Sequence, residues 1–266
     1  MGSMPSSDQN GLNQAYQEFA LVYDEMMREL DYPAWVEYVL YLYKNHHAFS
    51  ERAPVRSLLD LACGTGSFMA LMKEKGWKVT GVDQSPSMLA IAEDKLGQTK
   101  GEYRLFAQDI RELDLDEQFS LITCLCDSLN YLLLYGDLQQ VLVLIYQHLL
   151  PGGIAIADFN TEYKYREILG DNTFCAVFEN SAYIWANYLE PAGRLCRMEI
   201  DFFAREKGEL FRHFRETHWQ RWYEPDEIKE AARNAGFTQV RCFSAFTHQP
   251  CLPEDERIFF VFTREE

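Results

Sequence analysis

The sequence predicts a doubly wound α/β fold with a seven-stranded sheet and an antiparallel β insertion after the fifth core strand. In the first part of the chain, short apolar runs alternate with helical patterns, which is typical of a parallel sheet covered by helices. Between about Thr173 and Tyr223, apolar residues instead recur at every second position, which indicates antiparallel strands with one buried face. The predicted division is a core of residues 12–160 and 224–266, with an N-terminal helical cover over residues 12–50, and an insertion of residues 161–223.

The element that organises the core is the apolar run Ser57–Leu61, which contains Asp60 and leads into a glycine-rich turn. Gly64 and Gly66 can adopt backbone angles that side chains forbid, and they let a ligand lie against the main chain. A dinucleotide-binding turn of the form G-x-G-x-x-G would need a third glycine where this chain has Met69. The turn therefore departs from the dinucleotide pattern.

The next two predicted strands lead to further acidic residues. The run Lys78–Asp83 ends in an acid 17 residues after Gly66, where a carboxylate can accept hydrogen bonds from both hydroxyls of a ribose. Ser85 follows as the N-cap of a helix. The third run, Tyr103–Ala107, leads to Asp109. Because ligands of an open α/β sheet bind beyond the carboxyl ends of its strands, these residues predict one binding site at that edge.

The segment Asp60-Leu-Ala-Cys-Gly-Thr-Gly and the acids Asp83 and Asp109 together resemble the class I S-adenosylmethionine (SAM) methyltransferases, which have a Rossmann-like core. The resemblance implies that SAM is the cofactor, that Asp109 holds its adenine amino group, and that Tyr16 of the N-terminal cover binds its carboxylate. The cofactor-binding residues that it implies are Tyr16, Tyr23, Trp35, Ala62, Cys63, Gly64, Gly66, Asp83, Gln84, Met88, Gln108, Asp109, Ile110, Leu125, Cys126 and Asn130. Packing against the core is the alternative for the aromatic residues of the cover. The insertion resembles that of glycine N-methyltransferase and of antibiotic sugar N-methyltransferases.

The acceptor side is predicted beyond the fourth strand, Phe119–Cys124, and along the segment Phe214–Tyr223. Tyr131 follows the fourth strand and should border the transferred methyl group. As a strand, the second segment places Glu216 and His218 on one face, which indicates a wall of a partly wet cavity. We expect His218 to take a proton from the nucleophile, with Tyr131 as the other catalytic candidate. The alternative is an edge strand in which His218 and Glu216 form a solvated ion-pair ladder.

The implied reaction is methyl transfer to a nitrogen, oxygen or carbon nucleophile of a small molecule, and the sequence leaves the atom open. The protein would mainly align donor and acceptor and exclude water. Three alternatives remain. They are a nicotinamide-dependent oxidoreductase, a SAM-binding regulatory protein without transferase activity, and a methyltransferase that acts on tRNA or protein.

The composition and net charge of the chain help to choose among these functions. The 25 basic and 41 acidic residues give a net charge of −16, which disfavours a nucleic-acid partner. Seven cysteines, an odd number, and the lack of a recognisable secretory signal favour reduced thiols in the cytoplasm. No apolar run reaches the roughly 18 residues that a membrane span needs. The only close pair, Cys124 and Cys126, has no neighbouring His or Cys cluster, so we expect no metal site. A monomer or homodimer with a small-molecule acceptor is expected.

Overall fold

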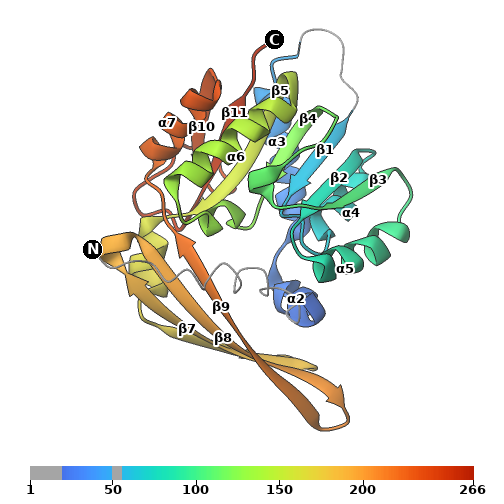
Figure 1. The fold of residues 1–266 in the computed structure, drawn as a ribbon, viewed down its shortest axis with the longest axis vertical. Coiled ribbons are helices and arrows are strands. Elements are labelled where there is room, and N and C mark those ends of the chain that lie inside the picture. Colours follow the sequence, from blue (N-terminus) through green and yellow to red (C-terminus); the bar gives the residue numbers. More distant parts are fainter. Residues whose placement is uncertain (1–19, 50–55) are drawn as a thin grey trace.

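A seven-stranded mixed sheet forms the core of the protein (Figure 1). The computed structural model describes residues 20–49 and 56–266. Five adjacent strands pair in parallel in the order β5-β4-β1-β2-β3, which agrees with the predicted fold class. Beyond β5, β11 pairs antiparallel with both β5 and β10, so β10 runs in the same direction as the five parallel strands. The strands are β1 (Ser57–Leu61), β2 (Lys78–Asp83), β3 (Tyr103–Ala107), β4 (Phe119–Cys124), β5 (Leu149–Asn160), β10 (Gln239–Ser244) and β11 (Arg257–Thr263).

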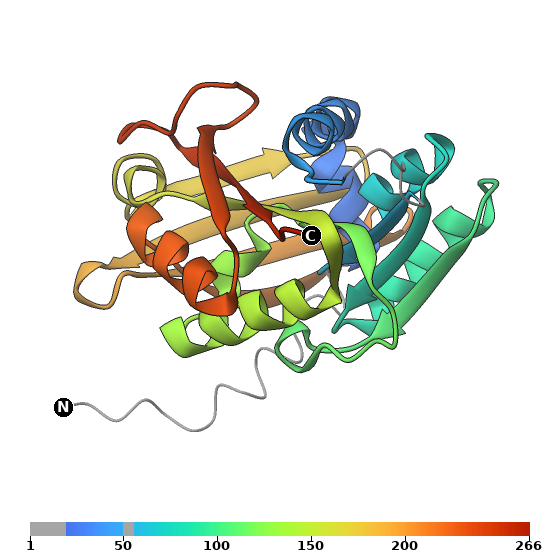
Figure 2. The ribbon, with the colours of Figure 1, turned by 90° about the horizontal axis from the view of Figure 1, so that it is seen from above.

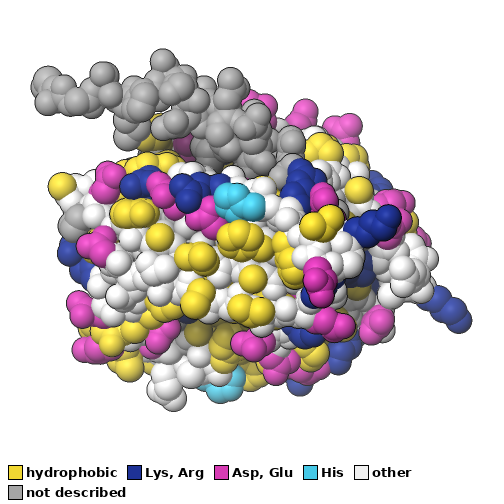
Figure 3. Space-filling view, turned by 90° about the horizontal axis from the view of Figure 1, so that it is seen from below, with side chains coloured by type: hydrophobic (Ala, Val, Ile, Leu, Met, Phe, Trp, Pro, Cys, Tyr) yellow, Lys and Arg dark blue, Asp and Glu magenta, His cyan; other side chains and the backbone are white. Residues whose placement is uncertain are grey.

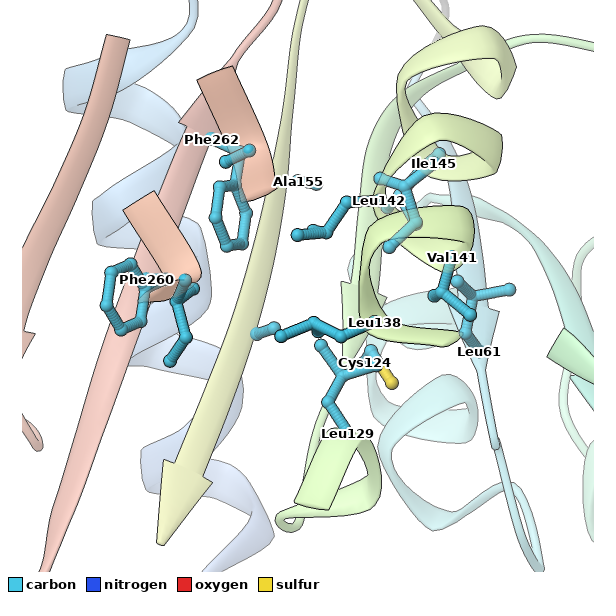
Figure 4. Packing of buried hydrophobic residues seen from close by; sticks show 14 of the residues in the cluster. Leu61, Cys124, Leu129, Leu138, Val141, Leu142, Ile145, Ala155, Phe260 and Phe262 are labelled. Atoms are coloured by element: carbon cyan, nitrogen blue, oxygen red, sulfur yellow. The ribbon is translucent and has the colours of Figure 1, made fainter. Parts of the chain in front are cut away.

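Helices cover both faces of this sheet (Figure 2). On one face, α3, α4 and α5 bury a cluster that includes Trp35, Phe68 and Leu96. On the other face, α6 and α7 bury the larger cluster, in which Leu138 and Leu142 of α6 lie against β4, β5 and β11 (Figure 4). The helices are α3 (Tyr32–His46), α4 (Ser67–Glu74), α5 (Pro86–Gly97), α6 (Tyr135–His148) and α7 (Pro225–Ala235). None of the helices within the described ranges is long and apolar enough to cross a bilayer.

Capping residues mark the start of α5 and the end of α7. The Ser85 hydroxyl accepts a hydrogen bond from the Met88 amide at 3.3 Å, which caps α5 one residue before Pro86. Gly236 ends α7 with a φ of 110°, a left-handed conformation that suits glycine. The strand β5 begins at Leu149, before the Pro-Gly-Gly segment, because Leu149 already pairs with Phe119 of β4. After that segment, β5 pairs with both β4 and β11.

A separate four-stranded antiparallel sheet forms the insertion, in the order β6-β7-β8-β9. Its strands are β6 (Thr173–Val177), β7 (Ser181–Glu190), β8 (Leu195–Lys207) and β9 (Leu210–Arg221), and the β8–β9 hairpin extends away from the core (Figure 1). Alternate residues point inward, so that Met198 of β8 lies opposite His218 of β9. The outer face mixes apolar side chains such as Ile184 with charged ones such as Arg215 (Figure 3).

The inner face of this sheet packs on α2 (Ala20–Met26) and on a π-helical turn, η4 (Lys164–Leu169). Val22 of α2, Tyr165 and Leu169 of η4, and Phe202 of β8 belong to this buried cluster. The insertion is therefore held over the carboxyl edge of the core sheet, and the space between the two sheets is the site.

Candidate functional site

A cavity of about 400 Å³ lies between the carboxyl ends of the core strands and the inner face of the four-stranded sheet. Most of the predicted site residues line it. They are Tyr23, Trp35, Ala62, Cys63, Gly64, Asp83, Gln84, Met88, Gln108, Asp109, Ile110, Leu125, Cys126, Tyr131 and His218. Tyr16 lies outside the described residues. Two predicted residues, Gly66 and Asn130, do not line the cavity.

The two glycines of the β1–α4 turn have different roles. Gly64 has a φ of 54°, and a Cβ built on it would meet no protein atom within 4 Å, so its missing side chain leaves the cavity open. Gly66, with a φ of 72°, would bring a Cβ within 3.0 Å of the Ala92 Cβ. Its missing side chain therefore lets α4 approach α5, and contact of Gly66 with the cofactor stays a prediction.

Asp83 at the end of β2 is tied into the same turn. Its Oδ2 accepts a hydrogen bond from the Gly64 amide and its Oδ1 from the Ser85 amide, both at 2.8 Å. Burial raises the pKa of Asp83, while these two amides act in the opposite direction. The carboxylate thus fixes the backbone of the glycine turn. Each oxygen retains a second lone pair, so binding of a ribose diol stays a prediction.

Asp60 of β1 is a buried carboxyl group on the cavity wall. Its Oδ1 accepts a hydrogen bond from the Thr123 hydroxyl at 2.6 Å. Burial raises the pKa of Asp60 to about 7; the hydrogen bond opposes that effect, and the charge of Asp83 adds to it. The group therefore changes its charge near neutral pH.

The end of the cavity at β3 carries Gln108, Asp109 and Ile110. Asp109 caps a short 3₁₀ turn, η2 (Ile110–Glu112), by accepting from the Arg111 amide at 2.8 Å, and it also pairs with the Arg111 guanidinium at 2.6 Å. Burial alone would raise the pKa of Asp109, but the hydrogen bonds from Arg111 outweigh it and lower the pKa. Asp109 is thus ionised and held in place at neutral pH.

The loop after β4 is strained and strongly braced. Cys126 and Asp127 both have left-handed backbones, with φ of 57° and 51°. The Arg257 guanidinium pairs with Asp127 at 2.7 Å and also with the buried Asp158 of β5. Gln220 of β9 donates to the other oxygen of Asp127 at 2.7 Å. These contacts fix the part of the loop that lines the cavity and connect it to the insertion.

Asn130 is part of this bracing. Its amide nitrogen donates to the carbonyl oxygens of Asn160 and Arg221, and its Oδ1 accepts from the Asn160 amide at 3.0 Å. The side chain is fully buried in these contacts. The prediction that Asn130 binds the cofactor is therefore replaced by a structural role, in which it joins the short 3₁₀ turn η3 (Ser128–Tyr131) to β5 and β9.

Glu216, His218 and Tyr131 form a chain of hydrogen-bonding groups. His218 Nε2 lies 3.0 Å from Glu216 Oε2, and His218 Nδ1 lies 3.2 Å from Tyr131 Oη. A carboxylate can only accept, so the neutral imidazole that fits this arrangement has its proton on Nε2 and accepts the tyrosine hydroxyl at Nδ1. Glu216 and His218 are buried rather than solvated, so the alternative of a solvated ion-pair ladder is wrong.

Several lining residues were missed by sequence reasoning. Lys164, Trp185 and Arg257 belong to this group. Asn160 also lines the cavity, and its place at the carboxyl end of a core strand was a signal that could have found it. Arg257 stands at the start of an apolar strand, where a charged residue more often faces solvent, so no local pattern distinguished it.

Known proteins are similar to this chain in sequence and in architecture. Residues 58–153 match the methyltransferase domain family. YqeM of Bacillus subtilis (strain 168), which bears a methyltransferase name, is 34% identical over 246 residues, covering 92% of this chain and 95% of that protein. A crystal structure of a S-adenosylmethionine-dependent methyltransferase from Clostridium acetobutylicum ATCC 824 has a TM-score of 0.81 and 30% identity, covering 94% of this chain and 99% of that one. The sugar N-methyltransferase KedS8 from Streptoalloteichus sp ATCC 53650 has a TM-score of 0.77 and 26% identity, covering 93% of each chain.

Proposed function

Because this chain belongs to the SAM-dependent methyltransferases, we propose that it transfers the methyl group of SAM to a nucleophile of a small molecule held under the four-stranded sheet. The observation that carries the cofactor assignment is the open space beside Gly64, where a Cβ would meet no protein atom. That cradle fits a ligand lying against the main chain. We assign the ribose hydroxyls to Asp83 and the adenine ring to the walls formed by Met88, Asp109 and Ile110.

SAM supplies an activated methyl group on a sulfonium centre, and the chain's own residues supply alignment and a path for a proton. The proton of an N–H or O–H nucleophile beside Tyr131 would pass to the Tyr131 oxygen as the tyrosine gives its own proton to His218 Nδ1. The imidazolium that forms would be stabilised by the buried Glu216 carboxylate. The chain of three residues thus accepts one proton for each methyl group transferred.

Loss of the imidazole is expected to reduce turnover without affecting the cofactor. In His218→Ala, turnover should fall at least about tenfold, within the usual range for a general base. Binding of SAM, measured separately by calorimetry, should stay within about twofold, because His218 lies on the insertion and not at the glycine turn. The matched control is His213→Ala. His213 is on the same strand but faces outward and pairs with Asp201, so turnover should be unchanged. Equal turnover in both variants would contradict the assignment and leave Tyr131 as the candidate.

SAM affinity is expected to rise as the pH increases from about 6 to about 8. Burial raises the pKa of Asp60 to about 7, and the ionised form attracts the positive charge of SAM. Below that pKa, binding must release a proton, so the dissociation constant should increase by up to about tenfold for each pH unit. Calorimetry in buffers of different ionisation enthalpy measures the released proton. Asp60→Asn removes the titrating group and should flatten the profile; an unchanged slope in this variant would refute the role of Asp60.

We infer further that the acceptor is a small molecule and that the enzyme acts in the cytoplasm. The cavity volume of about 400 Å³ supports the first point, because it is in the range of sites for small molecules. The net charge of −16 disfavours RNA, and all seven cysteines, which lie in the described ranges, are free thiols. A screen of amine, phenol and sugar acceptors with labelled SAM tests this inference. Label that appears on RNA or protein instead would contradict it.

A further inference from the structure

Three cationic side chains line the cavity, and two of them have carboxylate partners. Arg111 pairs with Asp109 and lies 3.5 Å from Asp137. Arg257 pairs with Asp127 and Asp158. Lys164 differs: its Nζ donates to the Asn160 side-chain oxygen at 2.9 Å, and no carboxylate of the described residues lies within 4 Å of it.

Lys164 is half-buried, and its ammonium group has no directly paired carboxylate among the described residues. Burial lowers the pKa of Lys164, and the nearby Arg257 lowers it further, while Asp127, Glu256 and Asp158 offset part of the effect from longer range. Buried charges in proteins are normally paired, because removing an ion from water is costly. With one donor hydrogen used by Asn160, two remain for a ligand.

The place of Lys164 in the fold puts it on the acceptor side of the cavity. It begins the π-helical turn η4, four residues after β5, and such turns are frequent at functional sites. In the core sheet, β5 lies on the far side of β4 from the glycine turn and from β2 and β3. Asn160, whose side chain accepts the hydrogen bond from Lys164, is also hydrogen-bonded through its backbone to the Asn130 side chain. Asn130 directly precedes Tyr131 in the chain.

The insertion and η4 also contribute apolar side chains to the cavity wall. Leu169 comes from η4, Trp185 from β7, and Met198 and Ile200 from β8. A molecule that fills this space would bury an apolar body against these side chains, with its nucleophile at Tyr131. A cationic group without a directly paired carboxylate, beside such apolar walls, favours a negative group on the ligand.

We propose that Lys164 binds an anionic oxygen group of the acceptor, a carboxylate or a phosphate, and that the acceptor is a small organic acid with an apolar body. This inference rests on the proposed function and adds the class of substrate to it. The carboxylate of SAM is the other possible source of the same chemistry, and the experiment must separate the two.

The test measures binding of matched acids and amides to the full chain saturated with S-adenosylhomocysteine. The probes are 3-aminobenzoate and 3-hydroxyphenylacetate, each beside its carboxamide, with phenyl phosphate beside phenol as the phosphate arm. We expect at least one charged probe to bind at least tenfold more tightly than its neutral partner. Lys164→Met and Lys164→Gln should reduce this preference to within twofold, whereas Lys164→Arg should retain it. SAM affinity should stay within twofold in all of these variants.

The matched control is Lys78→Met, because Lys78 is exposed on β2 and pairs with Glu102 outside the cavity. It should keep the full preference for the charged probes. The proposal is overturned if no charged probe is preferred, if the preference survives in Lys164→Met, or if that variant instead loses SAM affinity. Failure of the wild-type protein to bind SAM at all would be a different result, since it would refute the proposed function itself.

Discussion

Gly64→Leu is expected to abolish SAM binding. Gly64 lines the cavity, and a Cβ at this position would meet no protein atom within 4 Å, so a leucine side chain would occupy the space that we assign to the cofactor. We expect the dissociation constant to rise at least about a hundredfold, equivalent to about 2.8 kcal/mol. Titration calorimetry with SAM measures the effect directly, without knowledge of the acceptor.

A control variant at a second glycine, Gly208, separates the loss of SAM binding from the effect of backbone strain. Gly208, in the β8–β9 turn, has a φ of 60°, close to the 54° of Gly64, and its Cβ would also meet nothing within 4 Å. Leucine in a left-handed conformation costs about 1–2 kcal/mol at either site. Gly208→Leu should therefore show a similar loss of stability with normal SAM affinity. If both variants bind SAM normally, the cofactor does not lie at the glycine turn.

Arg257→Met is expected to produce the largest loss of stability. The guanidinium pairs with Asp127 and with Asp158, whose side chain is completely buried, and its removal leaves these carboxylates without a counter-ion. Breaking a buried pair from one side costs about 3–5 kcal/mol of the free energy of unfolding. Chemical denaturation at pH 7 measures this loss. Turnover should fall as well, because the strained backbone at Cys126 and Asp127 loses its brace.

The origin of that loss can be checked in two ways. Arg257→Met/Asp158→Asn removes a buried charge together with its partner and should recover a large part of the stability. Arg215→Met removes an exposed pair with Asp201 and should give no measurable change. In Arg257→Met alone, the pKa of Asp158 in the folded protein should rise further above its value in the unfolded chain. The deficit should then be smallest at acid pH and should grow as the pH rises. A deficit that does not vary with pH would point to lost packing instead.

The core fold was predictable because its signals are local. Each of β1, β2 and β4 is recognisable as a short, mainly apolar run. Three of the four acids that line the cavity, Asp60, Asp83 and Asp109, lie at or near the ends of β1, β2 and β3. The period-two pattern of the insertion also predicted that Glu216 and His218 share a face, as the structure shows. In both cases the periodicity of side chains along the backbone determines which of them face the site.

The features of the site that were not predictable depend on contacts between residues far apart in the chain. Tyr131 and His218 are 87 positions apart, and Arg257 is 130 positions from Asp127, so no short motif records either contact. Gly66 and Asn130 were predicted to bind the cofactor because the resemblance to SAM methyltransferases implied it. Their long-range contacts could not be predicted from the sequence: the Cα of Gly66 packs against α5, and the hydrogen bonds of the Asn130 side chain are made to the backbone of Asn160 and Arg221.

Side chains along β9 point alternately toward and away from the cavity, and this limits which sequence changes can alter the acceptor preference. Its inward positions include Glu216, His218 and Gln220, whereas Thr217 points away from the cavity. Deleting or inserting one residue within this stretch would turn every later side chain to the opposite face. New acceptor preferences should therefore evolve by exchange of inward side chains at constant strand length. Changes of length should accumulate at the β8–β9 hairpin tip around Gly208, where they leave the register near the core unchanged.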